Sequence, residues 1–372
     1  MLKLVAARIT PFRLCLKQPL ATAHGRVSRR ESWLIELRSR CGHSGFGEAA
    51  PLPGFRLEGH CEAGRALHHA ASRMLGLPAD EARAELDAFT PRAPAARAAL
   101  DMALHDLLSR AAGLPLCEWL ARREGRSGRA RVGVAALVAA TPAKAAAAEA
   151  RRRVAAGYTT LKLKLGAADF SADLERVVAV REAVSAETRL RLDANGGWKE
   201  AEAEARIAAL ASLDIELLEQ PVAADELAGL LRLCAAAPFP VAADESVRDV
   251  ASATLLLQAS VPPWLVLKPA ALGGLRTAGR VARLAELAGT RSVVTSFLDS
   301  AIGRSAALHF AASLPEGPAA GLATGSLMTG DLIARERDAG ALAVPSDPGL
   351  GFSPDPERLA RHASANTIEL RA

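Results

Sequence analysis

Aromatic residues and closely spaced cysteines are scarce in this sequence of 372 residues. Only 4% of the residues are Phe, Trp or Tyr, and the 46 basic side chains, against 41 acidic ones, form no stripe interleaved with rings. This composition indicates no nucleic-acid partner. The five cysteines include no CxxC pair, which argues against a disulfide framework and a zinc knuckle.

Long apolar runs are also missing. The sequence contains no uninterrupted stretch of about 18 apolar residues, the length that would predict a membrane span. Arg8 and Arg13 interrupt the first segment, where a signal peptide would be continuously apolar. We therefore expect a cytoplasmic protein without a membrane partner.

Lysine is rare, and its positions are informative. Only seven of the 46 basic residues are Lys, and three of these, Lys162, Lys164 and Lys268, lie in or at the end of apolar β-type runs. A guanidinium stays protonated, whereas a Lys amine in a partly desolvated site can lose its proton near neutral pH. These lysines are candidates for proton transfer, and the alternative for any one of them is a side chain that extends from a strand end to solvent.

The organisation of the chain predicts a barrel with a cap. From about residue 132, β-type runs alternate with helical stretches long enough for right-handed crossovers, which favours a parallel TIM-type barrel. The eight runs are residues 132–139, 160–165, 189–194, 215–220, 240–245, 264–269, 292–297 and 320–324. We expect an α+β capping domain over residues 1–130, the barrel over 131–330, and a segment over 331–372 that completes the cap.

Polar residues interrupt the carboxyl ends of the predicted barrel strands. They follow one another at about one βα unit, and active sites of this fold lie at that end of the barrel, so we expect one common cavity. The six residues are Lys162, Lys164, Asp193, Glu219, Asp244 and Lys268. The strand period of two places Lys162 and Lys164 on the same side of their strand.

Three of these residues are carboxylates on neighbouring strands. Asp193, Glu219 and Asp244 would repel one another unless a cation neutralised them, and oxygen-only ligation favours Mg²⁺, with Mn²⁺ as an alternative. Separate salt bridges to Arg are the structural alternative. A divalent ion on a substrate carboxylate stabilises the enediolate that forms when a flanking lysine removes the α-proton. The predicted partner is therefore a small-molecule carboxylate. The alternative is a protein with the same barrel that binds this ligand without turnover.

The ordered motifs resemble a known family. The chain is similar to the muconate-lactonizing-enzyme subgroup of the enolase superfamily in T-L-K-L-K-L, L-D-A-N-G-G-W, E-Q-P, A-D-E-S, L-K-P and the cap motif at residues 96–107. This resemblance implies a (β/α)7β barrel with an α+β cap and Mg²⁺ on Asp193, Glu219 and Asp244. It further implies that Lys164 is the base, assisted by Lys162.

The resemblance also assigns roles to other residues. Lys268 would stabilise the enediolate from the opposite face. Further residues would contact the substrate or orient the groups that do. These are Arg191, Asn195, Glu245, Ser296, Thr324, and His24 and Arg26 of a cap loop.

Within the subgroup, the chain most resembles the o-succinylbenzoate synthases, through G-E-A-A-P-L-P-G-F at residues 47–55, R-L-D-A-N and G-L-A-T. That family dehydrates 2-succinyl-6-hydroxy-2,4-cyclohexadiene-1-carboxylate for menaquinone biosynthesis. Two alternatives are the dipeptide epimerases and the N-succinylamino acid racemases. The epimerases carry Asp-x-Asp where this chain has Thr324-Gly325-Ser326, and the racemases tend to have Arg where it has Ala271. Muconate cycloisomerase is a further alternative for the activity. For the partners of the chain, a homo-oligomer is an alternative to a monomer.

Overall fold

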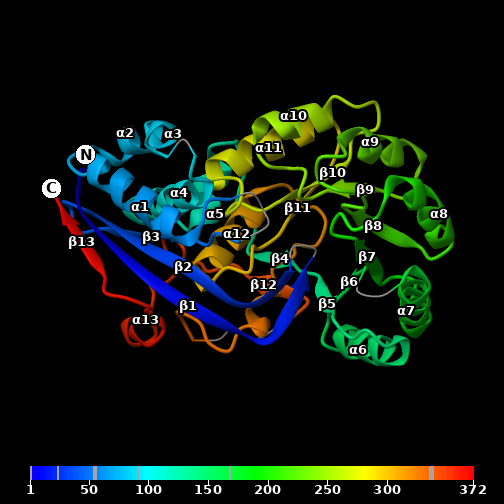
Figure 1. The fold of residues 1–372 in the computed structure, drawn as a ribbon. Helices are drawn as coiled ribbons and strands as arrows, with labels where there is room; N and C mark the ends of the chain where they lie inside the picture. Colours follow the sequence, from blue (N-terminus) through cyan, green and yellow to red (C-terminus); the bar gives the residue numbers. More distant parts are fainter. Residues whose placement is uncertain (1, 23–24, 53–56, 91, 167–168, 335–338) are drawn as a thin grey trace.

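The computed structural model describes residues 2–22, 25–52, 57–90, 92–166, 169–334 and 339–372. The chain forms a capping region and a barrel that lie side by side (Figure 1). Within the described residues, no helix combines the length and the apolar character needed to cross a membrane.

The cap is an antiparallel sheet covered by helices. Its strand order is β13-β1-β2-β3, so the last strand of the chain pairs with the first, with Ala6 opposite Arg371. The strands are β1 (Leu4–Thr22), β2 (Gly25–Ser39), β3 (Ser44–Ala49) and β13 (Ile368–Arg371). The helices are α1 (His60–Met74), α2 (Ala79–Ala84), α3 (Leu86–Phe89), α4 (Pro94–Ala111), α5 (Leu116–Arg122) and α13 (Pro356–His362).

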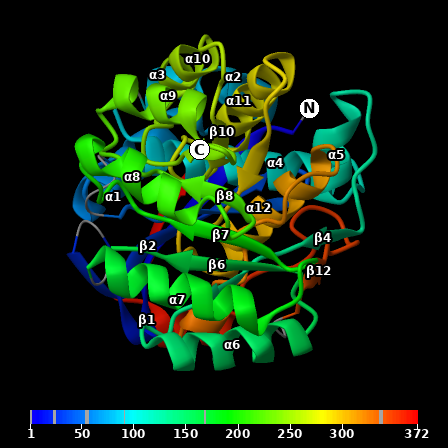
Figure 2. The ribbon, with the colours of Figure 1, turned by 90° about the vertical axis from the view of Figure 1, so that its right-hand side faces the viewer.

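The barrel is a parallel sheet of seven strands in the order β11-β10-β9-β8-β7-β6-β5. Its helices lie on the outside, where α6 and α7 run next to each other (Figure 2). The strands are β5 (Ala136–Val138), β6 (Thr160–Lys164), β7 (Arg189–Asp193), β8 (Ile215–Glu219), β9 (Val241–Ala243), β10 (Trp264–Leu267) and β11 (Ser292–Val294). The helices are α6 (Ala143–Ala155), α7 (Phe170–Ala183), α8 (Glu200–Leu210), α9 (Leu227–Ala236), α10 (Val250–Leu257), α11 (Leu275–Leu287) and α12 (Ala301–Ser313).

The closure of the barrel differs in detail from the sequence prediction. Instead of a full strand at residues 320–324, single parallel bridges join Ala320 to Val134 and Gly321 to Thr295. A 3-10 helix, η1 (Gly325–Leu327), follows at once and leaves no length for a regular strand. The predicted first strand is divided into β5 and β4 (Arg131–Gly133), and β4 pairs with β12 (Ala341–Ala343) outside the barrel.

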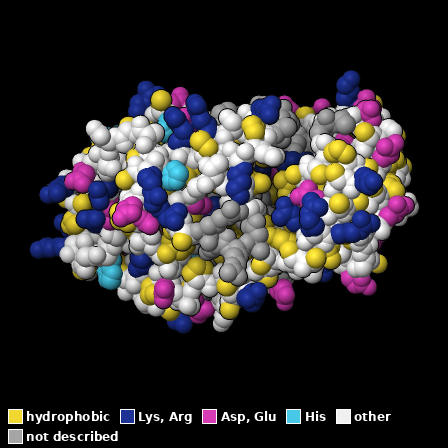
Figure 3. Space-filling view, turned by 90° about the horizontal axis from the view of Figure 1, so that it is seen from below, with side chains coloured by type: hydrophobic (Ala, Val, Ile, Leu, Met, Phe, Trp, Pro, Cys, Tyr) yellow, Lys and Arg dark blue, Asp and Glu magenta, His cyan; other side chains and the backbone are white. Residues whose placement is uncertain are grey.

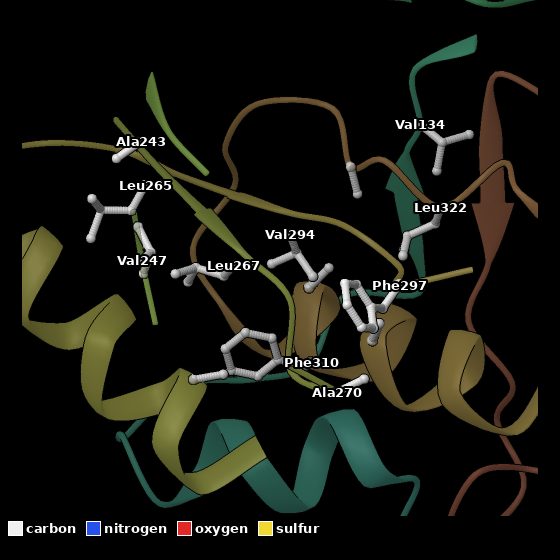
Figure 4. Close-up of a cluster of buried hydrophobic side chains, with 14 of the residues drawn as sticks. Val134, Ala243, Val247, Leu265, Leu267, Ala270, Val294, Phe297, Phe310 and Leu322 are labelled. Carbon is white, nitrogen blue, oxygen red and sulfur yellow. The ribbon is translucent and has the colours of Figure 1, made fainter. Parts of the chain in front are cut away.

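The described residues form two large apolar clusters and one small one, which stabilise this arrangement. The largest extends between the barrel strands and the surrounding helices, where Leu267 of β10, Val294 of β11 and Phe310 of α12 lie together (Figure 4). The small cluster joins Leu217 and Val266 with their strand neighbours in the barrel. On the face shown in Figure 3, basic and acidic side chains are interspersed among apolar ones.

Candidate active site

The structure brings the six polar strand-end residues to one end of the barrel. Lys164 is opposite Asp193 in the pairing of β6 with β7, and Asp193 is opposite Glu219 in the pairing of β7 with β8. Asp244 and Lys268 each follow the last residue of their strands, β9 and β10. Neighbouring parallel strands end at one level, so the regular spacing along the sequence becomes proximity in space.

Lysines neutralise all three carboxylates. The Lys162 Nζ lies 2.9 Å from Asp193 Oδ2 and also bonds Glu219. The Lys268 Nζ lies 2.5 Å from Asp244 Oδ1. Asp193, Glu219 and Asp244 are buried, with at most 5% of each residue exposed. Buried charges of this kind are tolerated because each has a partner of opposite sign.

These contacts control the protonation of the cluster. Burial favours the neutral amine of Lys162, but Asp193, Glu219 and Asp244 outweigh it and raise its pKa. Burial likewise disfavours the charged form of Lys268, and Asp244 and Glu245 raise its pKa above the usual value. Both side chains are therefore held as ammonium groups.

The carboxylates also affect one another. Burial raises the pKa of Glu219, and the nearby charges of Asp193 and Asp244 raise it further against the effect of Lys162. Asp193 differs, because Lys162 and Lys164 overcome the effect of burial and hold its pKa below the ordinary range. The lysines therefore favour the ionised form of Asp193, whereas the charge of Asp193 favours the protonated form of Glu219.

The donor set fits a divalent metal ion. In the described part of the chain, no three Asp, Glu, His or Cys side chains are arranged to hold a metal as they stand. Instead, the Lys162 ammonium interacts with the charges of Asp193, Glu219 and Asp244 together. Carboxylate oxygens are ligands that suit Mg²⁺, which takes waters or substrate oxygens at its remaining positions. Asp193, Glu219 and Asp244 are the residues that would hold the ion.

Asn195 connects the Lys164 side of the site with Glu245. Its Oδ1 accepts a hydrogen bond of 2.6 Å from Lys164 Nζ, and its Nδ2 donates one of 3.3 Å to Glu245 Oε1. Its backbone has φ 46°, a left-handed conformation that Asn tolerates better than most residues. Burial and the neighbouring Asp244 raise the pKa of Glu245 to about 7.

Gln220 is a positioning residue that the sequence interpretation did not identify. It is fully buried, and its Oε1 accepts hydrogen bonds from the backbone N–H groups of Asp244 at 2.8 Å and Ser246 at 3.2 Å. Its amide donates to Val222 O and Ser246 Oγ. Gln220 thus fixes the turn that presents Asp244. The E-Q-P motif contains it, but spacing alone gave no reason to single it out.

All residues of the charged cluster except Glu219 are among the described residues that line a cavity of about 150 Å³. Ser296 and Thr324 also line it, and their hydroxyl oxygens lie 2.7 Å apart. The remaining wall is largely apolar and includes residues of both the barrel and the cap. These residues are Leu20, Leu52, Ala135, Leu137, Phe297, Leu298, Ala323 and Leu327.

Comparison with known proteins identifies the family. A model described as mandelate racemase / muconate lactonizing enzyme, N-terminal domain, matches residues 5–121, and one described as enolase C-terminal domain-like matches residues 145–358. The chain belongs to the muconate-lactonizing-enzyme subgroup of the enolase superfamily. This confirms the family and the fold class predicted from the sequence.

Relatives of this enolase-superfamily chain have several activities. An o-succinylbenzoate synthase of Desulfotalea psychrophila is 30% identical, over 86% of this chain and 93% of the relative. An L-Ala-D/L-Glu epimerase of Bacillus subtilis is 31% identical, over 84% and 86%. The solved muconate lactonizing enzyme from Pseudomonas fluorescens, in complex with muconolactone, has a TM-score of 0.89 and 29% identity, over 97% and 99% of the two chains.

Three predicted residues of this superfamily member are not placed among the lysines and carboxylates. His24 lies outside the described residues. Arg26 is exposed and is not among the described residues that line the cavity. Arg191 is buried, but its guanidinium bonds Glu216 Oε2 and Ala319 O, each at 2.6 Å. The direct partners of Arg191 are therefore the Glu216 carboxylate on the neighbouring strand, which neutralises it, and the Ala319 carbonyl.

The cap of this enolase-superfamily chain also holds the turn that follows Lys268. Gly273 and Gly274 have φ values of 82° and 116°, which favour glycine. A Cβ on Gly274 would lie 2.6 Å from the Cβ of Asp101 on α4. Asp101 also accepts a hydrogen bond of 3.1 Å from the Arg276 backbone N–H. Close packing of α4 on this turn therefore fixes the chain beyond Lys268.

Proposed function

We propose that this protein is an o-succinylbenzoate synthase, a carbon–oxygen lyase that dehydrates 2-succinyl-6-hydroxy-2,4-cyclohexadiene-1-carboxylate to 2-succinylbenzoate. The observation that carries the proposal is the chemistry of the cavity wall. Among the described lining residues, the carboxylates are Asp193, Asp244 and Glu245, which lie beside Lys162, Lys164 and Lys268. Apart from these charged residues and Asn195, the described wall is apolar or carries hydroxyl groups. This wall suits an apolar ring better than a substrate with an ammonium group.

Lys164 is the proposed base. It lies at the end of β6 and lines the cavity, where Asn195 orients its Nζ at 2.6 Å. Lys162 lies two residues earlier on the same strand, so the two lysine side chains point to the same side of the strand. Lys164 would remove the proton α to the substrate carboxylate and return it to the departing hydroxyl group, which leaves as water.

The other charged residues stabilise the negative charge that develops on the substrate. Lys268 is held protonated by Asp244 and Glu245, which suits charge stabilisation rather than proton abstraction. A Mg²⁺ ion held by Asp193, Glu219 and Asp244, for which Mn²⁺ is an alternative, would supply further positive charge at the substrate carboxylate.

The implied context follows from the reaction. We propose a role in menaquinone biosynthesis with a small-molecule carboxylate as the partner, no nucleic-acid or membrane partner, and a homo-oligomer as an open alternative. The five cysteines are free thiols, which supports a reducing, cytoplasmic compartment.

An ultraviolet assay tests the proposal. Purified protein with Mg²⁺ should consume the diene absorbance of the cyclohexadiene carboxylate, and EDTA or Lys164→Ala should abolish the turnover. Lys144→Ala is the matched control, because Lys144 is exposed on α6, and it should retain full activity. Absence of turnover by the wild-type protein with Mg²⁺ would reject the dehydratase function.

A racemase or epimerase acting on acylated amino acids is the second candidate. Lys164 and Lys268 both line the cavity and come from strands that are four positions apart in the sheet, so two bases could face opposite sides of one carbon. Deuterium from the solvent should then enter Cα of N-succinylamino acids or dipeptides, and Lys268→Ala should block exchange of one enantiomer. In the dehydration, Lys268 transfers no proton.

A further inference from the structure

A second cavity, of about 490 Å³, lies at the junction of the cap and the barrel. The cap contributes residues of α2, α4 and α5, and the barrel contributes residues of α10, α11 and α12. Figure 1 places α11 between the barrel strands and the cap helices, and α11 contacts both β10 and α4. None of its described lining residues lines the catalytic cavity.

Arginine dominates the wall of this second cavity. Its described lining residues include six guanidinium groups, from Arg83, Arg123, Arg126, Arg276, Arg280 and Arg283, and two carboxylates, from Glu124 and Glu286. Glu286 binds Arg126 in a bidentate pair with distances of 2.6 and 3.0 Å, and it also contacts Arg283 at 3.3 Å. Two of the six cations thus share one carboxylate.

A third cation is neutralised from outside the cavity. The Arg276 Nη2 lies 2.7 Å from Asp87 Oδ2, and Asp87 is not among the lining residues. The remaining three arginines, Arg83, Arg123 and Arg280, have much weaker compensation.

Among the described residues, none of these three arginines has an ion pair closer than 3.8 Å. Arg83 reaches Asp80 only at 3.8 Å, and its Nε is buried with no hydrogen-bond partner among the described residues. Arg123 stacks on the Trp119 ring, with its Cζ 4.3 Å from the ring centroid. Arg280 is exposed on α11. Within the described part of the chain, its side chain forms no ion pair and no hydrogen bond.

The positive charges act on neighbouring groups. Burial lowers the pKa of Arg123, and repulsion from Arg83 lowers it further. Burial also lowers the pKa of His105, in the same wall, and Arg83 and Arg123 add to that effect against Asp101. The cavity therefore carries a positive field that the described carboxylates leave partly uncompensated.

We propose that this cavity binds a small molecule with at least two oxyanion groups, phosphate or carboxylate, and that the ligand joins the cap to the barrel. The planar guanidinium matches both oxyanions with paired hydrogen bonds. Arg83 and Arg123 belong to the cap, whereas Arg280 belongs to α11 of the barrel, so one ligand can contact both. Leu120, Leu284 and Phe310 supply an apolar floor for the body of the ligand.

Thermal unfolding and calorimetry test this site, with inorganic pyrophosphate and citrate as the two probes. Each is titrated at constant ionic strength against KCl. We expect at least one probe to raise the Tm of the wild-type protein saturably and beyond the effect of KCl. The stronger probe then shows whether phosphate or carboxylate is preferred.

Variants locate the binding. Arg123→Gln with Arg280→Gln should weaken binding about tenfold or more, because each change removes a charge-assisted hydrogen bond. Arg280→Glu alone should act in the same direction. Arg151→Gln, at an exposed position on α6, is the matched control and should bind like the wild type.

Two results would overturn the proposal. One is stabilisation by both probes that does not exceed the effect of KCl, and the other is unchanged affinity in the double variant and in Arg280→Glu. Neither Arg123 nor Arg280 lines the catalytic cavity, so turnover without the probes should be the same in all variants. This keeps a failure of this site distinct from a failure of the proposed catalytic function.

Discussion

Glu48→Gln should make the stability of this protein less dependent on pH. Glu48 lies on β3 and is 1% exposed. Its carboxylate accepts hydrogen bonds from the backbone N–H groups of Ser300 at 3.0 Å and Gly303 at 3.1 Å, and from the Ser300 hydroxyl at 2.5 Å. Despite these donors, burial and the neighbouring Asp299 raise its pKa from 4.5 to about 7.

The direction of the pH effect follows from proton linkage. Between pH 4.5 and pH 7 the folded protein holds the Glu48 proton more tightly than the unfolded chain does. The free energy of unfolding therefore falls as the pH rises through this window. At about 1.4 kcal/mol per pH unit, the two pKa values correspond to about 3 kcal/mol. Asp299 titrates together with Glu48, so we take this value as the upper end for Glu48 alone.

Urea unfolding followed by circular dichroism measures the effect. Wild-type protein should lose about 2 to 3 kcal/mol of unfolding free energy between pH 5 and pH 8 through this group. The loss of unfolding free energy over the same interval should be smaller by this amount in Glu48→Gln, because Gln keeps a hydrogen-bond acceptor but cannot ionise. Glu204→Gln, at an exposed position on α8, should match the wild type. A pH dependence in Glu48→Gln equal to that of the wild type would refute the reasoning.

Four further predictions concern the site and its support. Gly274→Ala should lower the unfolding free energy by about 1 to 3 kcal/mol in urea, because it combines a left-handed φ of 116° with a clash against Asp101; an unchanged midpoint would contradict the role of the turn. Leu217→Ala empties part of the fully buried cluster in the barrel and should cost about 2 to 5 kcal/mol, measured in the same way. Mg²⁺ should raise the Tm of the wild type by mass action but not that of Asp193→Asn, and equal shifts would argue against this ligand. Asn195→Ala should lower kcat about tenfold or more without removing the Mg²⁺-dependent rise in Tm, since it orients Lys164 and Glu245.

Local rules were sufficient to predict the charged cluster. A lysine within an apolar strand lowers the stability of the fold unless its charge has a partner or a function. The strand period of two places the side chains of Lys162 and Lys164 on the same side of their strand. One polar residue per βα unit places Asp193, Glu219 and Asp244 at one level, because parallel strands begin and end together. These inferences need only spacing, and for that reason they transfer from sequence to structure.

Contacts between distant segments could not be predicted in this way. Glu48 and Ser300 are 252 positions apart, and only the docking of β3 against the start of α12 brings them together. The same holds for Asp101 against Gly274 and for Arg191 with the Ala319 carbonyl. Each pairing depends on how the cap meets the barrel or on how the barrel closes, and neither leaves a periodic signal in the chain.

This division between local and distant contacts bears on substrate choice. The lysines and carboxylates lie on barrel strands, where hydrogen-bonded neighbours fix their positions. The cavity is completed from elsewhere, by Leu20 of β1 and Leu52 after β3 on the cap side. Changes at these two positions should therefore alter which acid fits, and so KM, more than the proton transfer itself. Relatives with one barrel chemistry can then act on different substrates, and the cap wall has to be tested with substrates rather than inferred from the lysines.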